Sequence, residues 1–122
     1  MKIDAFMPFY GSEFFNAVAG LSNEIIGIYM RCCWHYWSHT NCDGLPDDDE
    51  YLRELCRVDA AKWTDKKSKI FNGFLFKKTG GKWHQKRCKE EYAKALELRE
   101  KRKQQTDSAR NARWKRYSVT ES

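Results

Sequence analysis

The stretch DAAKWTDKKSKIFNGFLFKKTGGKWHQK, residues 59–86, decides the predicted fold. Its first half predicts a helix that begins after the N-cap Asp59 and turns Trp63 towards a core. Two short runs, 74–78 and 82–86, then flank a Gly-Gly pair, which supplies the positive φ angles of a two-residue hairpin turn. The stretch therefore predicts a helix followed by a β-hairpin.

Two further helices are predicted ahead of this stretch. Ser22 is a suitable N-cap for the first, in which apolar residues recur at steps of three and four as far as Trp37. The turn-rich segment 39–46 separates it from a shorter helix, opened by Pro46 and the acidic run 47–50. The predicted fold is α+β and mostly α: a winged helix-turn-helix with three helices and a β-hairpin wing. An α-helical bundle with an incidental hairpin is the alternative.

A last helix is expected from about Arg87, with its apolar side chains ending at Leu98. Residues 99–108 contain no apolar side chain, so they cannot pack on a core and form either a solvated helix or a disordered segment. We therefore expect a winged-helix domain over residues 1–98 and a basic tail over residues 99–122. The chain of 122 residues leaves no room for a second full domain.

The net charge of +6 is distributed unevenly along the chain. Residues 1–58 contain 4 Lys or Arg against 9 Asp or Glu, whereas residues 59–122 contain 19 against 8. A basic half of this kind is typical of proteins that contact nucleic acid or anionic membranes. Neither a membrane-spanning run nor the apolar core of a signal peptide is evident. We expect a cytoplasmic protein without membrane association, with its five cysteines reduced.

Lysines gather on the predicted third helix and around the hairpin tip. In a winged helix both elements address the same side of a duplex, the helix in the major groove and the wing along phosphates. No Arg, Asn or Gln is well placed to read bases, so the expected binding depends on phosphate contacts and is weakly specific. A solvated lysine face without a ligand is the alternative. The predicted DNA-binding residues are Lys62, Thr64, Lys66, Lys67, Lys69, Lys77, Lys78 and Lys82.

The tail interleaves arginines with aromatic residues. Such a segment can follow a single-stranded backbone and stack on its bases, or it can dock as a short motif on a protein such as a helicase or its loader. A solubilising tail with no binding role is the third alternative. The predicted tail contacts are Arg110, Arg113, Trp114 and Arg116.

Strand alternation in the hairpin places successive side chains on opposite faces. We expect Trp83 to pack between the hairpin and the first long helix, and His84 to face the other way. Neither residue is predicted to bind a ligand.

Metal and enzyme chemistry are weaker alternatives. Asp43 and the acidic run 47–50 are explained more simply by helix capping than by a divalent metal site. Cys88 and His84 have no third group to orient a catalytic pair. We expect no enzyme activity, no metal and no cofactor. A zinc site at a helix end and the following loop is left open by the spacing of four side chains, Cys32, His35, His39 and Cys42.

Several strings resemble the YdaU-like family of uncharacterised phage and prophage proteins. The resemblance covers about residues 7–98, and the basic string SARNARWKR at 108–116 is similar to the tails that follow such domains. It implies a winged-helix-like domain encoded in phage replication regions and sometimes described as a replication-initiation protein. The string CCWH at 32–35 departs from the Leu-rich pattern of the family. The strings that carry the resemblance are MPFY at 7–10, LSNE at 21–24, Gly27, Tyr29, Tyr36-Trp37, GLPDDD at 44–49, Trp63 and WHQKR at 83–87.

The residues and the resemblance together predict a phage or prophage DNA-binding protein that acts in replication initiation or its regulation. The alternative is an adaptor, in which the winged helix is a scaffold and the tail binds a helicase loader or a host factor.

Overall fold

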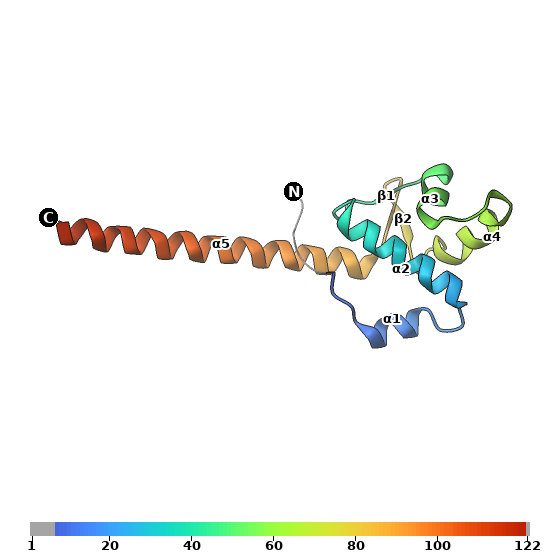
Figure 1. Cartoon of the computed structure of the whole chain (residues 1–122), viewed down its shortest axis with the longest axis horizontal. Coiled ribbons are helices and arrows are strands. Elements are labelled where there is room, and N and C mark those ends of the chain that lie inside the picture. The colour runs from blue at the N-terminus through green and yellow to red at the C-terminus, as the bar shows by residue number, and fades with distance from the viewer. Residues whose placement is uncertain (1–6, 122) are drawn as a thin grey trace. The chain divides into compact units, whose positions relative to one another are not determined.

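The computed structural model describes the backbone of residues 7–121 and the side chains of residues 7–115. Helix α2 (Asn23–Ser38) contributes many of its buried side chains. Within residues 7–121 the chain forms five helices and one small antiparallel sheet, so the predicted α+β, mostly α class is confirmed (Figure 1). The other elements are α1 (Gly11–Ala17), β1 (Leu45–Pro46), α3 (Asp49–Cys56), α4 (Ala60–Ile70), β2 (Lys77–Thr79), β3 (Lys82–His84) and α5 (Lys86–Glu121).

The chain divides within α5 into two compact units, residues 1–92 and residues 93–122. Tyr92 is buried, whereas the described side chains beyond it are exposed, apart from a half-buried Ala95. The first unit contains 14 Lys or Arg against 13 Asp or Glu, and the second contains 9 against 4. Most of the net positive charge therefore belongs to the second unit.

The core of the first unit is built around aromatic side chains from α2 and from the segment after α4. The hydroxyl oxygen of Ser22 accepts a hydrogen bond from the backbone N–H of Ile25 at 3.2 Å, which confirms the predicted N-cap of α2. Tyr36 and Phe76 are fully buried, and their ring centroids lie 6.0 Å apart, edge to face. Since a buried aromatic ring removes a large apolar area from water, few residues are needed to stabilise this unit.

The sheet has the strand order β1-β3-β2, and all its pairs are antiparallel. Gly80 and Gly81 have φ angles of 60° and 77°, which confirms the glycine turn of the hairpin. Strand β2 is shorter than the predicted run 74–78, because the side-chain oxygen of Asn72 accepts hydrogen bonds from the backbone N–H groups of Phe74 and Leu75 and holds this segment in a turn. Strand β3 is shorter than the run 82–86, since α5 already begins at Lys86. Strand β1 was not predicted, because a strand of two residues is too short to show an alternation of apolar and polar side chains.

The two faces of β3 are the reverse of the prediction. Trp83 lies away from α2: its ring contacts Phe71 at 5.3 Å and its Nε1–H donates to Asp47 at 3.0 Å. His84 is the residue that contacts α2, through a 2.9 Å hydrogen bond between its Nδ1 and the Tyr36 hydroxyl group. Apolar character alone predicted the wrong face, because a buried tyrosine hydroxyl group also requires a polar partner.

Helix capping also differs in part from the prediction. Asp48 is the N-cap of α3, and its carboxylate accepts from the backbone N–H groups of Glu50 and Tyr51 at 2.9 and 3.3 Å. Asp59 occupies the N-cap position of α4, but its side chain makes no capping hydrogen bond. At the start of α4 the backbone carbonyl oxygen of Asp59 accepts a hydrogen bond from the Lys62 N–H at 2.9 Å, and Trp63 is buried in the first turn.

Candidate nucleic-acid interface

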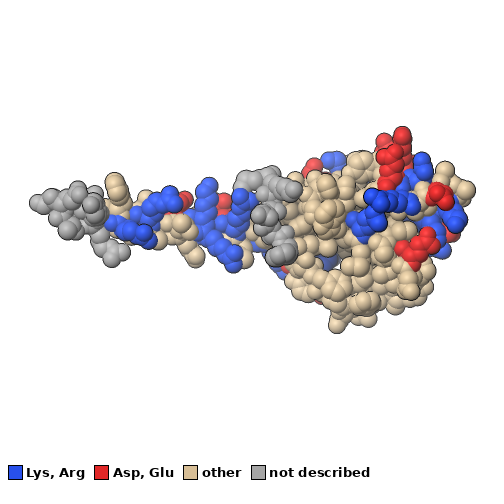
Figure 2. Space-filling model, in the orientation of Figure 1, with Lys and Arg blue, Asp and Glu red and all other residues tan. Residues whose placement is uncertain are grey.

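Most lysines predicted to contact DNA form ion pairs within the first unit. Their carboxylate partners come from α2, from α3 and the segment before it, and from α4 itself. On the face shown in Figure 2, acidic and basic side chains of this unit lie next to each other. The pairs are Lys66–Glu24 (3.1 Å), Lys67–Asp49, Lys69–Asp65 (3.4 Å), Lys78–Asp47 (3.0 Å) and Lys82–Asp43 (3.2 Å).

Lys62 and Lys77 differ from these five lysines. Both are exposed, and neither forms an ion pair with any residue that the structure describes. Thr64 is likewise exposed on α4. Lys66, by contrast, has a side chain that is only 16% exposed beside its glutamate. A polyanion would meet Lys62, Thr64 and Lys77 directly, whereas at the other lysines it would have to displace a carboxylate.

Asp47 and Asp49 each link a tryptophan to a lysine. Asp47 accepts from Lys78 at 3.0 Å and from Trp83 Nε1–H at 3.0 Å, which joins the start of α3 to the hairpin. Asp49 accepts from Lys67 and from Trp63 Nε1–H at 3.2 Å, which joins α3 to α4. Sequence reasoning assigned this acidic run to helix capping and missed both links, because no spacing along the chain reveals partners so distant in sequence.

Acidification is expected to weaken the first unit through these two links. Hydrogen bonds from Lys78 and from Lys67 hold the pKa values of Asp47 and Asp49, respectively, below their usual range. A carboxyl group with a pKa lowered by folding stabilises the fold above its unfolded pKa, and that stabilisation is lost as pH falls through its folded pKa. When the pH is lowered below about 4, the urea concentration at the midpoint of unfolding should therefore decrease. This decrease should be smaller in the Asp47→Asn variant. An equal fall in both proteins would contradict this assignment.

The side chains of the possible zinc site face different partners. The sulfur atom of Cys32 lies 3.5 Å from that of Cys56, and Nε2 of His35 lies 2.6 Å from the Tyr51 hydroxyl group. The thiol of Cys42 donates instead to a backbone carbonyl oxygen in α5. Among the side chains of residues 7–115, no three or more from His, Cys, Asp or Glu are grouped to hold a metal ion. His84, the other member of the possible catalytic pair with Cys88, bonds to the Tyr36 hydroxyl group.

The second unit presents a row of basic side chains along α5, which we call the basic stripe. Arg99 lies three residues before Arg102 and four before Lys103, and Arg110 lies seven residues after Lys103 and three before Arg113, so all five share one broad side of a helix with 3.6 residues per turn. All five are exposed. From first to last they span about 21 Å at 1.5 Å per residue. Glu100 and Asp107 lie beside the stripe rather than within it. The stripe consists of Arg99, Arg102, Lys103, Arg110 and Arg113.

The predicted tail contacts lie partly in this stripe. Arg110 and Arg113 belong to it, and Trp114 lies one helical turn beyond Arg110 with 70% of its surface exposed. The side chain of Arg116 is outside the described residues. Residues 99–108 are helical, which is one of the two forms expected of them. The spacing of the stripe was readable in the sequence, but an extended or disordered tail would not have placed these side chains on one side.

Comparison with known proteins gives one match. A family model described as "Protein of unknown function (DUF1376)" matches residues 5–93, which is nearly the whole of the first unit. No curated protein and no solved structure matches the chain. None of the described helices combines the length and the apolar character needed to cross a membrane.

Proposed function

The chain belongs to the family described as "Protein of unknown function (DUF1376)", which brings no activity with it, and we propose that the protein binds nucleic acid, with duplex DNA as its main ligand. The observation that carries this proposal is the basic stripe of α5. Five cationic side chains on one side of an exposed helix match the phosphates along one strand of a duplex. Binding of this kind is weakly specific, because contacts to phosphates do not read the bases.

The first unit contributes a smaller set of contacts in this proposal. We propose a winged-helix arrangement, with α4 as the helix that approaches the duplex and the β2–β3 turn as the wing. The element order from α2 to β3 and the strand order β1-β3-β2 support this arrangement. Lys62, Thr64 and Lys77 are its direct contacts, since the remaining lysines of the predicted interface are already paired with carboxylates.

The resemblance to YdaU-like proteins supports a role in phage or prophage replication initiation or its regulation. In that role, a weakly specific protein would reach its target by combining phosphate contacts with a second copy or with a replication partner. Catalysis is not part of the proposal.

A salt titration of the full chain tests the proposal. The five cations of the basic stripe alone predict that the logarithm of the binding constant for a short DNA duplex falls with the logarithm of salt concentration at a slope of about −4 to −5, and contacts from Lys62 and Lys77 would make the slope steeper. Fluorescence anisotropy of a labelled duplex measures this slope. A binding constant that does not change with salt concentration would contradict the proposal, because it would mean that phosphate contacts do not stabilise the complex.

An adaptor is the second candidate, and Trp114 is the observation that favours it. An exposed tryptophan is costly to leave in water and is enriched at protein interfaces. If the adaptor is correct, Trp114→Ala should abolish co-purification of a replication helicase or its loader while leaving duplex affinity unchanged. If Trp114 instead stacks on unpaired bases, the same variant should lose affinity for single-stranded DNA and not for duplex.

A further inference from the structure

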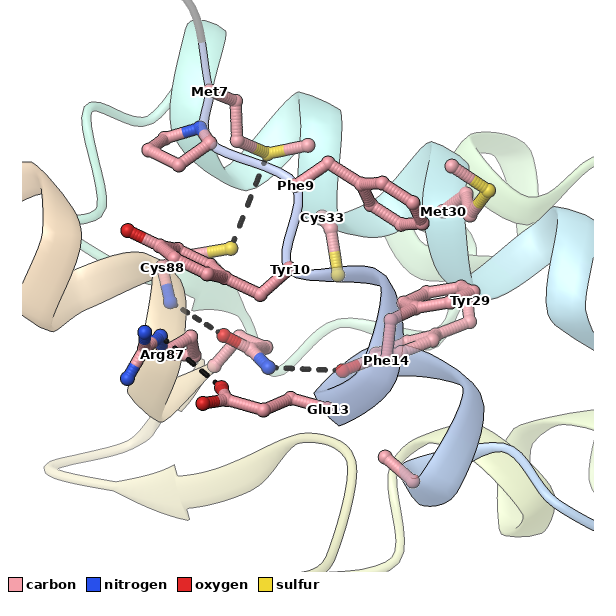
Figure 3. Close-up of a pocket in the computed structure, with 13 residues that line it drawn as sticks. Met7, Phe9, Tyr10, Glu13, Phe14, Tyr29, Met30, Cys33, Arg87 and Cys88 are labelled. Carbon is pink, nitrogen blue, oxygen red and sulfur yellow. Dashed lines mark hydrogen bonds and ion pairs between the residues drawn. The ribbon is translucent and has the colours of Figure 1, made fainter.

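A pocket of about 240 Å³ lies in the first unit, between the segment 7–17, helix α2 and the start of α5 (Figure 3). Aromatic and aliphatic side chains make up most of its wall, and Arg87 and Glu13 form an ion pair at one side, 3.4 Å apart. Two thiols, those of Cys33 and Cys88, also line it. The pocket therefore gives small molecules access to two cysteines that are far apart in the sequence.

The two thiols line this pocket together. Cys33 on α2 and Cys88 on α5 lie close enough for each thiol to shift the pKa of the other, and Figure 3 shows both sulfur atoms turned towards the pocket interior. The thioether sulfur of Met7, which also lines the pocket, lies 4.0 Å from the sulfur of Cys88. Cys88 is half-buried, whereas the four other cysteines are buried.

A second thiol pair provides a contrast. The sulfur atoms of Cys32 and Cys56 lie 3.5 Å apart, close enough to react with each other. Their side chains are 0% and 3% exposed, and neither residue lines the pocket. The first unit thus holds two thiol pairs of similar chemistry that differ in their access to solvent.

We propose that Cys33 and Cys88 are an oxidation site, at which hydrogen peroxide entering the pocket converts the two thiols into a disulfide between α2 and α5. Peroxide is small and uncharged, so the apolar wall admits it more readily than a charged oxidant. This inference is independent of nucleic-acid binding, because it concerns only residues of the first unit.

Cys88 is the sulfur that attacks the peroxide. It is the third residue of α5, and a helix N-terminus stabilises a thiolate. Proximity to the Cys33 thiol lowers the pKa of Cys88, whereas the pKa of Cys33 is raised, so Cys88 is the thiol of the pair that ionises more readily.

The reaction has two steps and balances without a further reagent. In the first, the thiolate of Cys88 forms an S–O bond as the O–O bond breaks, and the departing hydroxide takes up a proton to become water. In the second, the sulfur of Cys33 attacks that of the sulfenic acid. The S–S bond forms, the S–O bond breaks, and the hydroxyl group leaves with the proton of Cys33 as water. Two thiols are oxidised, and one peroxide is reduced to two water molecules.

Treatment of the folded full-length chain with hydrogen peroxide tests the proposal. Free thiols should fall from five per chain to three, and dithiothreitol should restore them. Mass spectrometry of non-reduced peptides should identify a Cys33–Cys88 link in the folded protein. A link between Cys88 and Cys42, a Cys32–Cys56 link formed first, or oxidation without any disulfide would each overturn the proposal.

Single substitutions separate the two pairs. Cys33→Ser and Cys88→Ser should each abolish the disulfide, and Cys33→Ser should leave Cys88 trapped as a sulfenic acid that reacts with dimedone. Cys56→Ala is the matched control and should form the link as the native chain does. If a serine variant fails to fold, the peptide map of the native chain still decides the outcome. A disulfide that appears only after unfolding in urea would overturn the proposal.

Discussion

Replacement of Arg102, Lys103, Arg110 and Arg113 by glutamine should lower the affinity for duplex DNA about a thousandfold at 0.1 M salt. Each phosphate contact that is lost removes the release of one condensed cation, so the slope of the salt titration should also become shallower by about 3 to 4. Glutamine resembles Arg and Lys in helix propensity, and these side chains are exposed. The helix is therefore retained while its charge is removed.

The same helix offers a matched control for this prediction. Lys101 and Lys115 lie away from the basic stripe, and Lys101 is paired with Glu97 at 3.4 Å. Their replacement by glutamine should change the slope much less for each charge removed. If the stripe variant keeps full affinity while replacement of Lys62 and Lys77 abolishes binding, the main contacts lie in the first unit instead.

Phe76→Ala should cost about 3–5 kcal/mol of the free energy of unfolding, a large part of the roughly 5–15 kcal/mol that a small domain has. The Phe76 side chain is fully buried, and its ring centroid lies 6.0 Å from that of Tyr29 and 5.3 Å from that of Phe71. Alanine would leave a cavity between the segment after α4 and helix α2. Denaturant unfolding measured by circular dichroism gives the change.

Phe74 provides the control for this second prediction, two residues earlier in the same segment. Its side chain is 74% exposed, so Phe74→Ala should change the stability by no more than about 0.5 kcal/mol. A similar loss of stability in the two variants would contradict the structure, in which Phe76 is buried and Phe74 is exposed.

The sequence predicted what depends on local periodicity and on special backbone angles. The apolar face of α2 and the Gly80-Gly81 turn are of this kind, because a helical repeat and positive φ angles limit the residues that fit. Strand β1 is not, since Leu45 and Pro46 become a strand only by pairing with β3. Long-range pairing of this type leaves no local signal.

The candidate interface shows the same division. The lysines on α4 and the hairpin were predictable as a cluster, but their carboxylate partners were not, because Lys66 and Glu24 or Lys78 and Asp47 meet only in the folded chain. Counting basic residues along the sequence therefore overstated the positive potential of this surface.

The lysine–carboxylate pairs of the first unit also change what a salt titration can detect. When a phosphate replaces Asp47 beside Lys78, the duplex gives up a cation, and the freed carboxylate takes one up. The exchange is nearly neutral in ions, so contacts at these lysines would contribute affinity with little salt dependence. If the protein binds duplex DNA as proposed, one chain would combine two classes of phosphate contact, one weakened by rising ionic strength and one much less sensitive to it.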